Sequence, residues 1–259
     1  MTRISTENKS RLLVMLVAMP SLILILLNQK AILIATMIIL LICTIEIFRH
    51  IYKSAKLMLA VIFTMISMIL LNQINSNFFL MFNLLSVPLL IILLLNSNVK
   101  KYTVSLTSFF YITILGSNLI FLILQSDSIN IILLILIVSF TSDSFAYLIG
   151  KKIGKSNLSI RFSKNKTWEG AIGGYIFGLL SCFICVYIFN FEKHLSILIL
   201  TVFFLPIACQ IGDIMGSILK RKINIKDFSQ LLFSHGGFMD RLDSITVTAL
   251  VFNLLFFWQ

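Results

Sequence analysis

The stretch FFLMFNLLSVPLLIILLLN, residues 78–96, contains no charged side chain and is long enough to be a membrane-spanning helix. A span needs roughly 20 mainly apolar residues, because about 30 Å of hydrocarbon must be crossed. Nine such runs occur along the chain: 11–28, 31–48, 57–71, 78–96, 104–124, 131–150, 169–190, 195–219 and 242–258. They are too long and continuous for barrel strands, which alternate with a period of two. The sequence therefore predicts an all-α polytopic integral membrane protein with about nine transmembrane helices.

The basic residues are concentrated in alternate loops between these runs. The formal net charge is +11, a value that on its own would also suit a nucleic-acid-binding protein. With the N-terminus placed in the cytoplasm, 19 of the 21 lysines and arginines fall in the cytoplasmic tail and loops. This is the alternation that the positive-inside rule requires. The pattern predicts an N-in, C-out orientation and attributes the charge to topology, so no nucleic-acid partner is expected.

The two halves of the chain differ in composition. Ten of the 11 glycines lie between Gly150 and Gly237, and seven of the 10 acidic residues lie at or after Asp143. Residues 1–130 are therefore predicted to form a platform of transmembrane helices or a surface for self-association, for example as a homodimer. Residues 131–259 are predicted to form a catalytic transmembrane region with cytoplasmic loops.

Two aspartates lie inside predicted spans of the second half. Asp143 occurs in LIVSFTSDSFAYLIG (136–150) and Asp213 in FLPIACQIGDIMGSILK (204–220). A charged side chain at mid-membrane costs at least ~2.5–3.5 kcal/mol, so such residues usually face the bundle interior or water and have a function. The alternative is a structural ion pair or a position near the interface. For Asp213 this alternative has weight, because Lys220 at the surface is only about 10 Å further along the helix.

The run EGAIGGYIFG, residues 169–178, places Gly170, Gly174 and Gly178 on one face of a helix, which predicts close packing against a neighbouring helix. The same helix begins near Thr167. Its N-terminal N–H groups are expected to face the cytoplasmic loop, where they attract phosphate.

The strongest concentration of polar groups is GDIMGSILKRKINIKDFSQLLFSHGGFMDRLDS, residues 212–244. On a helix, Asp213, Ser217 and Lys220 share one face, and Asp240 and Asp243 share a face of the next helix. The intervening loop is basic. Its two glycines, Gly236 and Gly237, are expected to allow a tight turn and to leave backbone N–H groups open to a ligand.

Carboxylates from two helices beside lysines and arginines suit Mg²⁺ and a polyphosphate. Mg²⁺ prefers one or two carboxylates together with waters and substrate phosphates. The residues alone thus suggest phosphoryl or nucleotidyl transfer at the cytoplasmic face of a membrane. The structural alternative is two helix ends neutralised by salt bridges and joined by a loop whose charge only sets topology.

SILKRKINIKD (217–227) followed by HGGFMDRLDS (235–244) closely resembles the C-terminal motif of the phosphatidate cytidylyltransferases, the CDP-diacylglycerol synthases. That motif is S-x-x-K-R-x4-K-D, a short spacer, and then H-G-G-x-x-D-R-x-D. Its positions are filled here by Ser217, Lys220, Arg221, Lys226, Asp227, His235, Gly236, Gly237, Asp240, Arg241 and Asp243. Three upstream segments also resemble the family: NKTWEGAIGG (165–174), QIGD (210–213) and DSFAY (143–147).

A few positions depart from the family pattern. Phe233 and Ser234 replace a Pro-Gly pair before the histidine, and Ser229 stands where glycine is usual. Lys164 replaces a common proline and Phe145 a small residue. None of these changes removes a charged group.

The resemblance implies that CTP and phosphatidic acid react to give CDP-diacylglycerol and pyrophosphate at a lipid bilayer. It also implies a bacterial-type inner membrane with the catalytic loops in the cytoplasm, and Mg²⁺ as cofactor. Asp213 and Asp240 are the expected metal ligands. The other residues expected to act in catalysis, as phosphate-binding groups or further carboxylates, are Lys220, Arg221, Lys226, Asp227, Arg241 and Asp243. The residues expected to bind substrate are Lys166, Thr167, Trp168, Glu169, Ser217, His235, Gly236, Gly237 and Asp143.

Two other functions are compatible with intramembrane acids. A transporter would use them as a proton or ion relay, but it usually shows internal repeats and paired broken helices, and neither is visible in the sequence. Another CTP-using lipid transferase is chemically closer and would use the same charged residues on a different lipid.

Overall fold

The computed structural model describes residues 28–53, 55–96, 101–159, 163–231 and 236–257, and most of these residues are α-helical. The helices are α2 (Gln29–Phe48), α3 (Ala55–Gln73), α4 (Ser76–Leu95), α5 (Lys101–Ile123), α6 (Ser128–Ile153), α7 (Trp168–Phe189), α8 (Leu195–Lys222) and α9 (Met239–Phe256). A short antiparallel ribbon of β1 (Asn157–Ser159) and β2 (Ser163–Thr167) separates α6 from α7.

The prediction of an all-α membrane protein is confirmed. Seven of these helices, α2 to α8, are long and apolar enough to cross a membrane. The last predicted span forms α9, whose first turns carry three charged residues. The predicted span 11–28 lies outside the described residues, so the total of nine stays a prediction.

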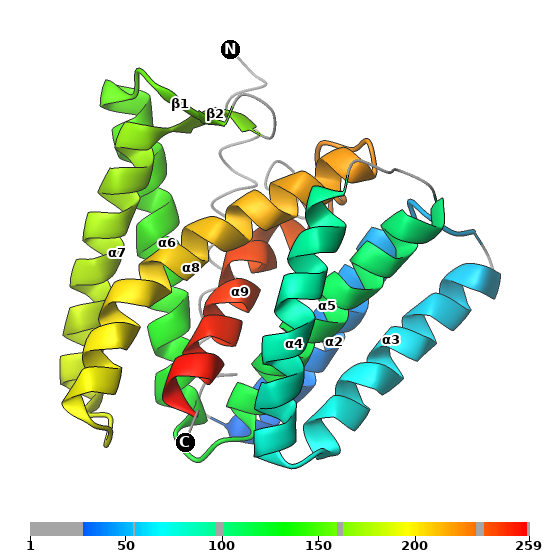
Figure 1. Ribbon diagram of the computed structural model, residues 1–259, viewed down its shortest axis with the longest axis horizontal. Coiled ribbons are helices and arrows are strands. Elements are labelled where there is room, and N and C mark those ends of the chain that lie inside the picture. Colours follow the sequence, from blue (N-terminus) through cyan, green and yellow to red (C-terminus); the bar gives the residue numbers. More distant parts are fainter. Residues whose placement is uncertain (1–27, 54, 97–100, 160–162, 232–235, 258–259) are drawn as a thin grey trace, which may run out of the picture.

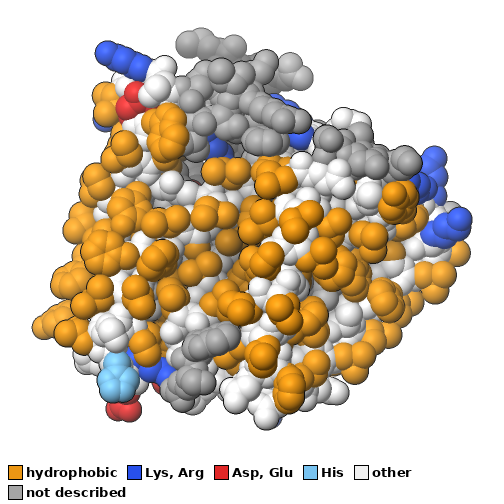
Figure 2. All heavy atoms as spheres, viewed as in Figure 1, with side chains coloured by type: hydrophobic (Ala, Val, Ile, Leu, Met, Phe, Trp, Pro, Cys, Tyr) orange, Lys and Arg blue, Asp and Glu red, His pale blue; other side chains and the backbone are white. Residues whose placement is uncertain are grey.

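Successive helices run in opposite directions (Figure 1). The C-terminal ends of α2, α4, α6 and α8 lie at the upper end of the molecule, together with the ribbon and the start of α9. Figure 2 shows hydrophobic side chains over the middle of this face, with several Lys and Arg side chains at its upper edge. An apolar band bounded by charge suits a bilayer. Which end faces the cytoplasm remains a prediction.

Helix α5 lies at the centre of the first half. From Tyr111 to Ile123 every residue of α5 is buried, and the helix packs against α2, α3, α4 and α9. Within it Asn118 donates to Asn83 of α4 (2.9 Å) and accepts from Asn253 of α9 (2.7 Å). Buried side-chain hydrogen bonds of this kind join helices inside a membrane, where there is no hydrophobic force between them.

The predicted close packing of the glycine-rich helix is confirmed. A Cβ atom on Gly170 or Gly174 of α7 would lie 2.7 Å from the carbonyl oxygen of Ala146 or Ser142 on α6. Gly178 lies against α8 in the same way. The absence of side chains at these positions brings α7 directly onto α6, next to Asp143.

Candidate active site

A cavity of 660 Å³ opens between α6, α7, α8, α9 and the end of β2. Four aspartates line it: Asp143 from α6, Asp213 from α8, and Asp240 and Asp243 from α9. Its basic lining residues are Lys151, Lys166 and Arg241. Parts of the sequence that lie up to a hundred residues apart thus form one highly charged site, as the motifs predicted.

Asp213 forms an ion pair with Lys166. The Oδ2 atom of Asp213 lies 2.5 Å from Nζ of Lys166, which projects from β2. Both side chains remain partly exposed, at 39% and 25% of their surface. The predicted metal ligand and the predicted phosphate-binding lysine therefore meet inside the cavity and neutralise each other in this state.

Asp240 is the most extensively hydrogen-bonded of the four aspartates. Its Oδ1 atom lies 3.0 Å from Nζ of Lys220 at the end of α8. Its Oδ2 atom accepts hydrogen bonds from the backbone N–H groups of Phe228 (3.0 Å) and Gly237 (2.8 Å). Asp240 thus bonds to two separate points of the segment between α8 and α9, Phe228 and Gly237. Its side chain is only 7% exposed.

Glycine is required for a different structural reason at each of the two positions before α9. Gly236 has φ = +83°, which favours glycine. A Cβ atom on Gly237 would lie 2.7 Å from the carboxylate of Glu46 and from the hydroxyl of Ser229. The expectation that these N–H groups stay open to a ligand is wrong for Gly237, because Asp240 accepts its hydrogen bond. His235, Phe233 and Ser234 lie outside the described residues.

Asp143 and Asp243 lie where α6, α8 and α9 meet. Asp143 accepts hydrogen bonds from the hydroxyl of Ser244 (3.2 Å) and the thiol of Cys209 (3.6 Å). Asp243 is 3% exposed and packs against Gly216 of α8. Its Oδ2 atom has no hydrogen-bond partner among the described residues. A buried carboxylate oxygen without a donor is expensive, and a cation or a proton would stabilise it.

The N-terminus of α7 borders the cavity. Thr167 caps the helix by accepting a hydrogen bond from the N–H of Gly170 (3.2 Å), and both residues line the cavity. Glu169 instead accepts hydrogen bonds from the N–H (3.2 Å) and hydroxyl (2.7 Å) of Ser156, which fixes the ribbon to the helix. Trp168 is 55% exposed and, like Glu169, lies outside the lining of the cavity.

Several predicted residues lie beyond the cavity. The described lining does not include Ser217, Arg221, Lys226 or Asp227. Arg221, Lys226 and Asp227 are exposed at and beyond the end of α8, and Nη1 of Arg221 donates to the carbonyl of Ile225 (3.3 Å). The basic residues of the motif therefore fall into two groups. Lys220 contacts the cavity-lining residue Asp240, whereas Arg221 and Lys226 lie outside the described lining.

The sequence analysis missed some residues of the site. Tyr147 and Lys151 line the cavity because they follow Asp143 at steps of four on α6. Helical spacing could have identified both. Glu46 of α2 is 1% exposed and contacts the loop before α9. The criterion applied to Asp143, an acid inside an apolar span, would have singled it out.

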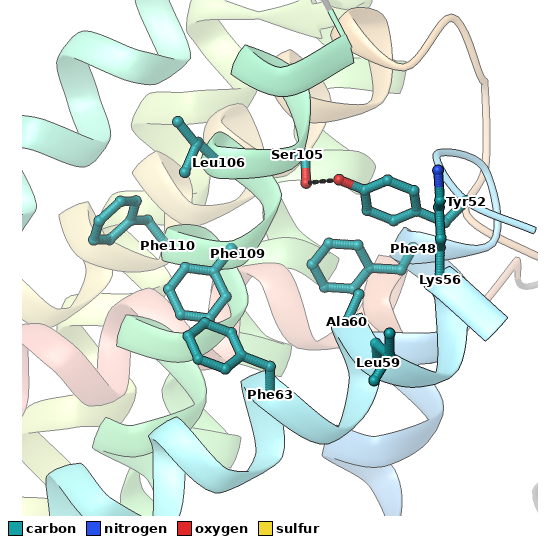
Figure 3. A pocket seen from close by; sticks show the side chains of 10 residues that line it. All are labelled: Phe48, Tyr52, Lys56, Leu59, Ala60, Phe63, Ser105, Leu106, Phe109 and Phe110. Atoms are coloured by element: carbon teal, nitrogen blue, oxygen red, sulfur yellow. Dashed lines mark hydrogen bonds between the residues drawn. The ribbon is translucent and has the colours of Figure 1, made fainter.

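A second cavity, of 490 Å³, lies between α2, α3 and α5 (Figure 3). Aromatic and aliphatic side chains form most of its wall, with the rings of Phe63 and Phe109 stacked 5.2 Å apart. At one end the hydroxyl groups of Tyr52 and Ser105 lie 2.7 Å apart, near Lys56. The described lining of this cavity includes no acidic side chain, the kind of ligand that Mg²⁺ prefers.

The charged cavity offers the type of ligand that suits Mg²⁺. Its donors are carboxylate oxygens, the type that Mg²⁺ prefers, and the unpartnered Oδ2 of Asp243 adds a free acceptor. In the described part of the chain no three acidic, His or Cys side chains are grouped closely enough to hold a metal by themselves. The residues therefore fit a Mg²⁺ ion bound by one or two carboxylates and completed by water and substrate oxygens.

Comparison with known proteins agrees with this geometry. The model of the cytidylyltransferase family matches residues 9–258. A phosphatidate cytidylyltransferase of Staphylococcus haemolyticus is 35% identical over 131 residues, which is 51% of this chain and 50% of that protein. One from Haemophilus influenzae is 35% identical over 133 residues, 49% of this chain and 46% of that protein. The chain thus aligns with about half the length of these relatives. Because the family model covers nearly all of the sequence, the chain belongs to the cytidylyltransferase family.

Proposed function

We propose that this protein transfers the cytidylyl group of CTP to phosphatidic acid, giving CDP-diacylglycerol and pyrophosphate. The observation that carries the proposal is the cavity in which Asp143, Asp213, Asp240 and Asp243 meet Lys166 and Arg241. The relatives named phosphatidate cytidylyltransferase support the same reaction.

The reaction suits a site that has carboxylates and cations but no catalytic triad. An oxygen of the lipid phosphate attacks the α-phosphorus of CTP, and the bond from that phosphorus to the β-phosphate oxygen breaks. Pyrophosphate leaves with the electron pair. The nucleophile is already ionised near neutral pH, so no strong base is required. The protein must bring two anions together in line and stabilise the developing charge.

The basic residues are proposed to bind phosphate groups. Lys166 exchanges the carboxylate of Asp213 for a substrate phosphate, and the N-terminus of α7 next to Thr167 adds backbone N–H donors. Arg241 lines the cavity beside Asp240 and is placed to bind the leaving pyrophosphate. Lys220 holds Asp240 in position through their 3.0 Å ion pair.

Asp213 and Asp240 are proposed to hold Mg²⁺, with Asp243 as the next candidate because of its unpartnered oxygen. When bound, the ion would neutralise charge on the phosphate groups of CTP. The two carboxylates come from different helices, α8 and α9, so their separation depends on how these helices pack.

The bilayer is proposed to supply one substrate. The acyl chains of phosphatidic acid remain in the lipid while its phosphate enters the cavity from the side of the bundle. CTP enters from the cytoplasm, which places the upper end of Figure 1 at the cytoplasmic face of a bacterial-type inner membrane. Self-association as a homodimer stays a prediction that chemical cross-linking in membranes would test.

The decisive experiment is an assay of the purified full-length protein in vesicles that contain phosphatidic acid. With CTP and Mg²⁺, CDP-diacylglycerol and pyrophosphate are expected to appear in equal amounts. ATP in place of CTP is the control for nucleotide choice, and phosphatidylglycerol in place of phosphatidic acid is the control for the nucleophile. Absence of product with CTP and phosphatidic acid, or equal turnover with ATP, would contradict the proposal.

A further inference from the structure

A buried acid from the first half of the chain contacts the turn that leads into α9. Glu46 of α2 is 1% exposed. Its Oε1 atom accepts a hydrogen bond from the N–H of Phe238 (3.1 Å), and its Oε2 atom accepts one from the N–H of Met239 (2.9 Å). The hydroxyl of Ser229 also donates to Oε1. One carboxylate therefore binds both the start of α9 and the loop that precedes it.

The end of the same helix holds a second part of that loop. Nη2 of Arg49 donates to the carbonyl of Phe228 (2.8 Å), and Nε2 of His50 lies 2.9 Å from the same oxygen. The N–H of Phe228 in turn donates to Oδ2 of Asp240 (3.0 Å). The backbone of a single residue, Phe228, thus connects the end of α2 to the proposed metal ligand.

The contacts of Glu46 and those of Arg49 and His50 both involve segments that are hydrogen-bonded to Asp240. Residues 237–239, next to Glu46, include the N–H of Gly237 that donates to Oδ2 of Asp240. The only other N–H group bonded to this oxygen is that of Phe228, among the described residues. Within the described residues, both backbone hydrogen bonds to the Asp240 carboxylate therefore come from segments that α2 contacts.

We infer that Glu46 is a positioning residue, which fixes the turn before α9 and through it the orientation of Asp240 and Arg241. This inference rests on the proposed function and adds a role for the first half of the chain, which contributes no residue to the described lining of the cavity. Glu46 itself does not line the cavity. It contacts the turn from outside the described lining of the cavity.

A carboxylate suits this task for electrostatic reasons. The first N–H groups of a helix have no partner within the helix, and the N-terminal end carries partial positive charge. The two oxygens of Glu46 accept from two successive N–H groups there. A glutamine has the same shape but only one acceptor oxygen, and its NH₂ group would face an N–H donor. Glu46→Gln should therefore loosen the turn without creating a cavity.

The chain offers a matched control. Asn83 of α4 is fully buried and hydrogen-bonded to Asn118, so Asn83→Ala also removes a polar contact inside the bundle. Asn83 bonds to Asn118 of α5, which in turn bonds to Asn253 of α9, and none of these hydrogen bonds involves the turn. A general loss of stability would therefore affect both variants, and a local effect on the turn would affect only Glu46→Gln.

Amide hydrogen exchange of the full-length protein in lipid vesicles tests the structural part without substrate. Exchange at Gly237, Phe238 and Met239 is expected to be at least tenfold faster in Glu46→Gln and unchanged in Asn83→Ala. Kinetic measurements test the consequence. Glu46→Gln should lower kcat/KM at least tenfold and raise the Mg²⁺ concentration needed for half-maximal activity, while Glu46→Asp, which keeps the charge, should recover part of both.

If amide exchange at the turn is unchanged in Glu46→Gln, the inference is overturned. It is also overturned if exchange is faster but the kinetics and the Mg²⁺ dependence remain those of the wild-type protein. An equal kinetic loss in Asn83→Ala would also overturn it, because the effect would then reflect stability alone. If the wild-type protein has no cytidylyltransferase activity, the proposed function fails. The exchange data then decide by themselves whether Glu46 holds the turn.

Discussion

Each of the two proposed metal ligands has a lysine as its partner. Asp213 pairs with Lys166 and Asp240 with Lys220, at 2.5 and 3.0 Å. Carboxylates that converge on one cavity repel each other unless cations neutralise them. The lysines supply that neutralisation in this state. Under the proposed function Lys166 would exchange Asp213 for a substrate phosphate, and Mg²⁺ would neutralise the released carboxylate.

Replacement of these aspartates by asparagine tests the metal site. Asp213→Asn and Asp240→Asn keep the shape of the side chain and remove its charge, so both variants are expected to insert into the membrane and accumulate normally. Both should lose most activity, and the residual activity should depend less on Mg²⁺. Steady-state kinetics at a series of Mg²⁺ concentrations measures this.

Asp127→Asn is the matched control for the metal site. Asp127 precedes α6 at the lower end of Figure 1 and makes no side-chain capping hydrogen bond. It should therefore be silent. Near-normal activity with an unchanged Mg²⁺ requirement in either Asp213→Asn or Asp240→Asn would exclude these residues as the ligands.

The basic residues of the motif are predicted to be required for activity rather than only to set topology, Lys220 through its ion pair with Asp240, and Arg221 and Lys226 from outside the described lining of the cavity. Lys220→Gln, Arg221→Gln and Lys226→Gln should each lower kcat/KM tenfold or more, about 1.4 kcal/mol in transition-state stabilisation. Lys53→Gln and Lys56→Gln remove basic residues just before α3 and in its first turn, at the same end of the molecule, and should leave activity largely intact. Equal tolerance in the two sets would favour the topological interpretation.

At the scale of helices, the site depends on how closely α8 and α9 approach. A Cβ atom on Gly212 of α8 would lie 2.8 Å from Cα of Ser244, and it would also meet the carbonyl oxygen of Asp243 at 2.5 Å. Both neighbours belong to the backbone of α9, so they cannot move aside without moving the helix. The spacing between Asp213 and Asp243 is therefore set by this contact.

Gly212→Ala is predicted to push α9 away from α8. Overpacking of this kind typically costs about 1–3 kcal/mol, and thermal unfolding in detergent should show the loss together with reduced activity. Gly116→Ala is the control, because its Cβ would meet only the flexible end of Met68 and a methyl group of Leu40, at 3.0 Å or more. A Gly212→Ala variant as stable and active as Gly116→Ala would refute the importance of this contact.

The helices themselves could be predicted from hydropathy to within a few residues. The predicted span 57–71 appears as α3 (Ala55–Gln73), and the predicted span 104–124 as α5 (Lys101–Ile123). A membrane leaves few alternatives to a helix for a long apolar segment. The ribbon of β1 and β2 was not predicted, because strands of three and five residues in a polar loop have no hydropathy pattern that reveals them.

The site could be predicted only in part. Asp143, Asp213 and Lys166 share the cavity as expected, since each belongs to a motif with recognisable chemistry. The contribution of Glu46 depends on α2 lying beside the loop before α9, a contact between residues more than 180 positions apart. An acid inside an apolar span marks Glu46 itself, but nothing in the local sequence of either segment indicates that the two are in contact.

At the scale of the whole molecule, contacts join the two regions predicted to divide near residue 130. Helix α5 packs against α9 as well as against its neighbours in sequence, and Asn118 bonds to Asn253 across that boundary. The division of the chain into a platform and a catalytic region stays a prediction. The described contacts show that the first half supports the second directly, at Glu46 and at Asn118.

The orientation in the membrane is the remaining property of the whole molecule. The ends of α2, α4, α6 and α8 lie together, so the loops that hold most of the basic residues face the same side (Figure 1). With 19 of the 21 lysines and arginines assigned to that side, the positive-inside rule predicts that it is cytoplasmic.

Reporter fusions after Lys101, Lys155 and Lys222 should therefore all report a cytoplasmic location, and a fusion at the C-terminus should report the opposite side. The location of the C-terminal fusion depends on that of the fusion after Lys222, because α9 begins at the end of the bundle where α8 finishes and runs to the other end. If all four fusions reversed together, the charge argument would be wrong and the helix arrangement would stand. A cytoplasmic C-terminus with the other three fusions unchanged would instead mean that α9 does not cross the bilayer, which would place Asp240 and Asp243 in a different setting from the one proposed.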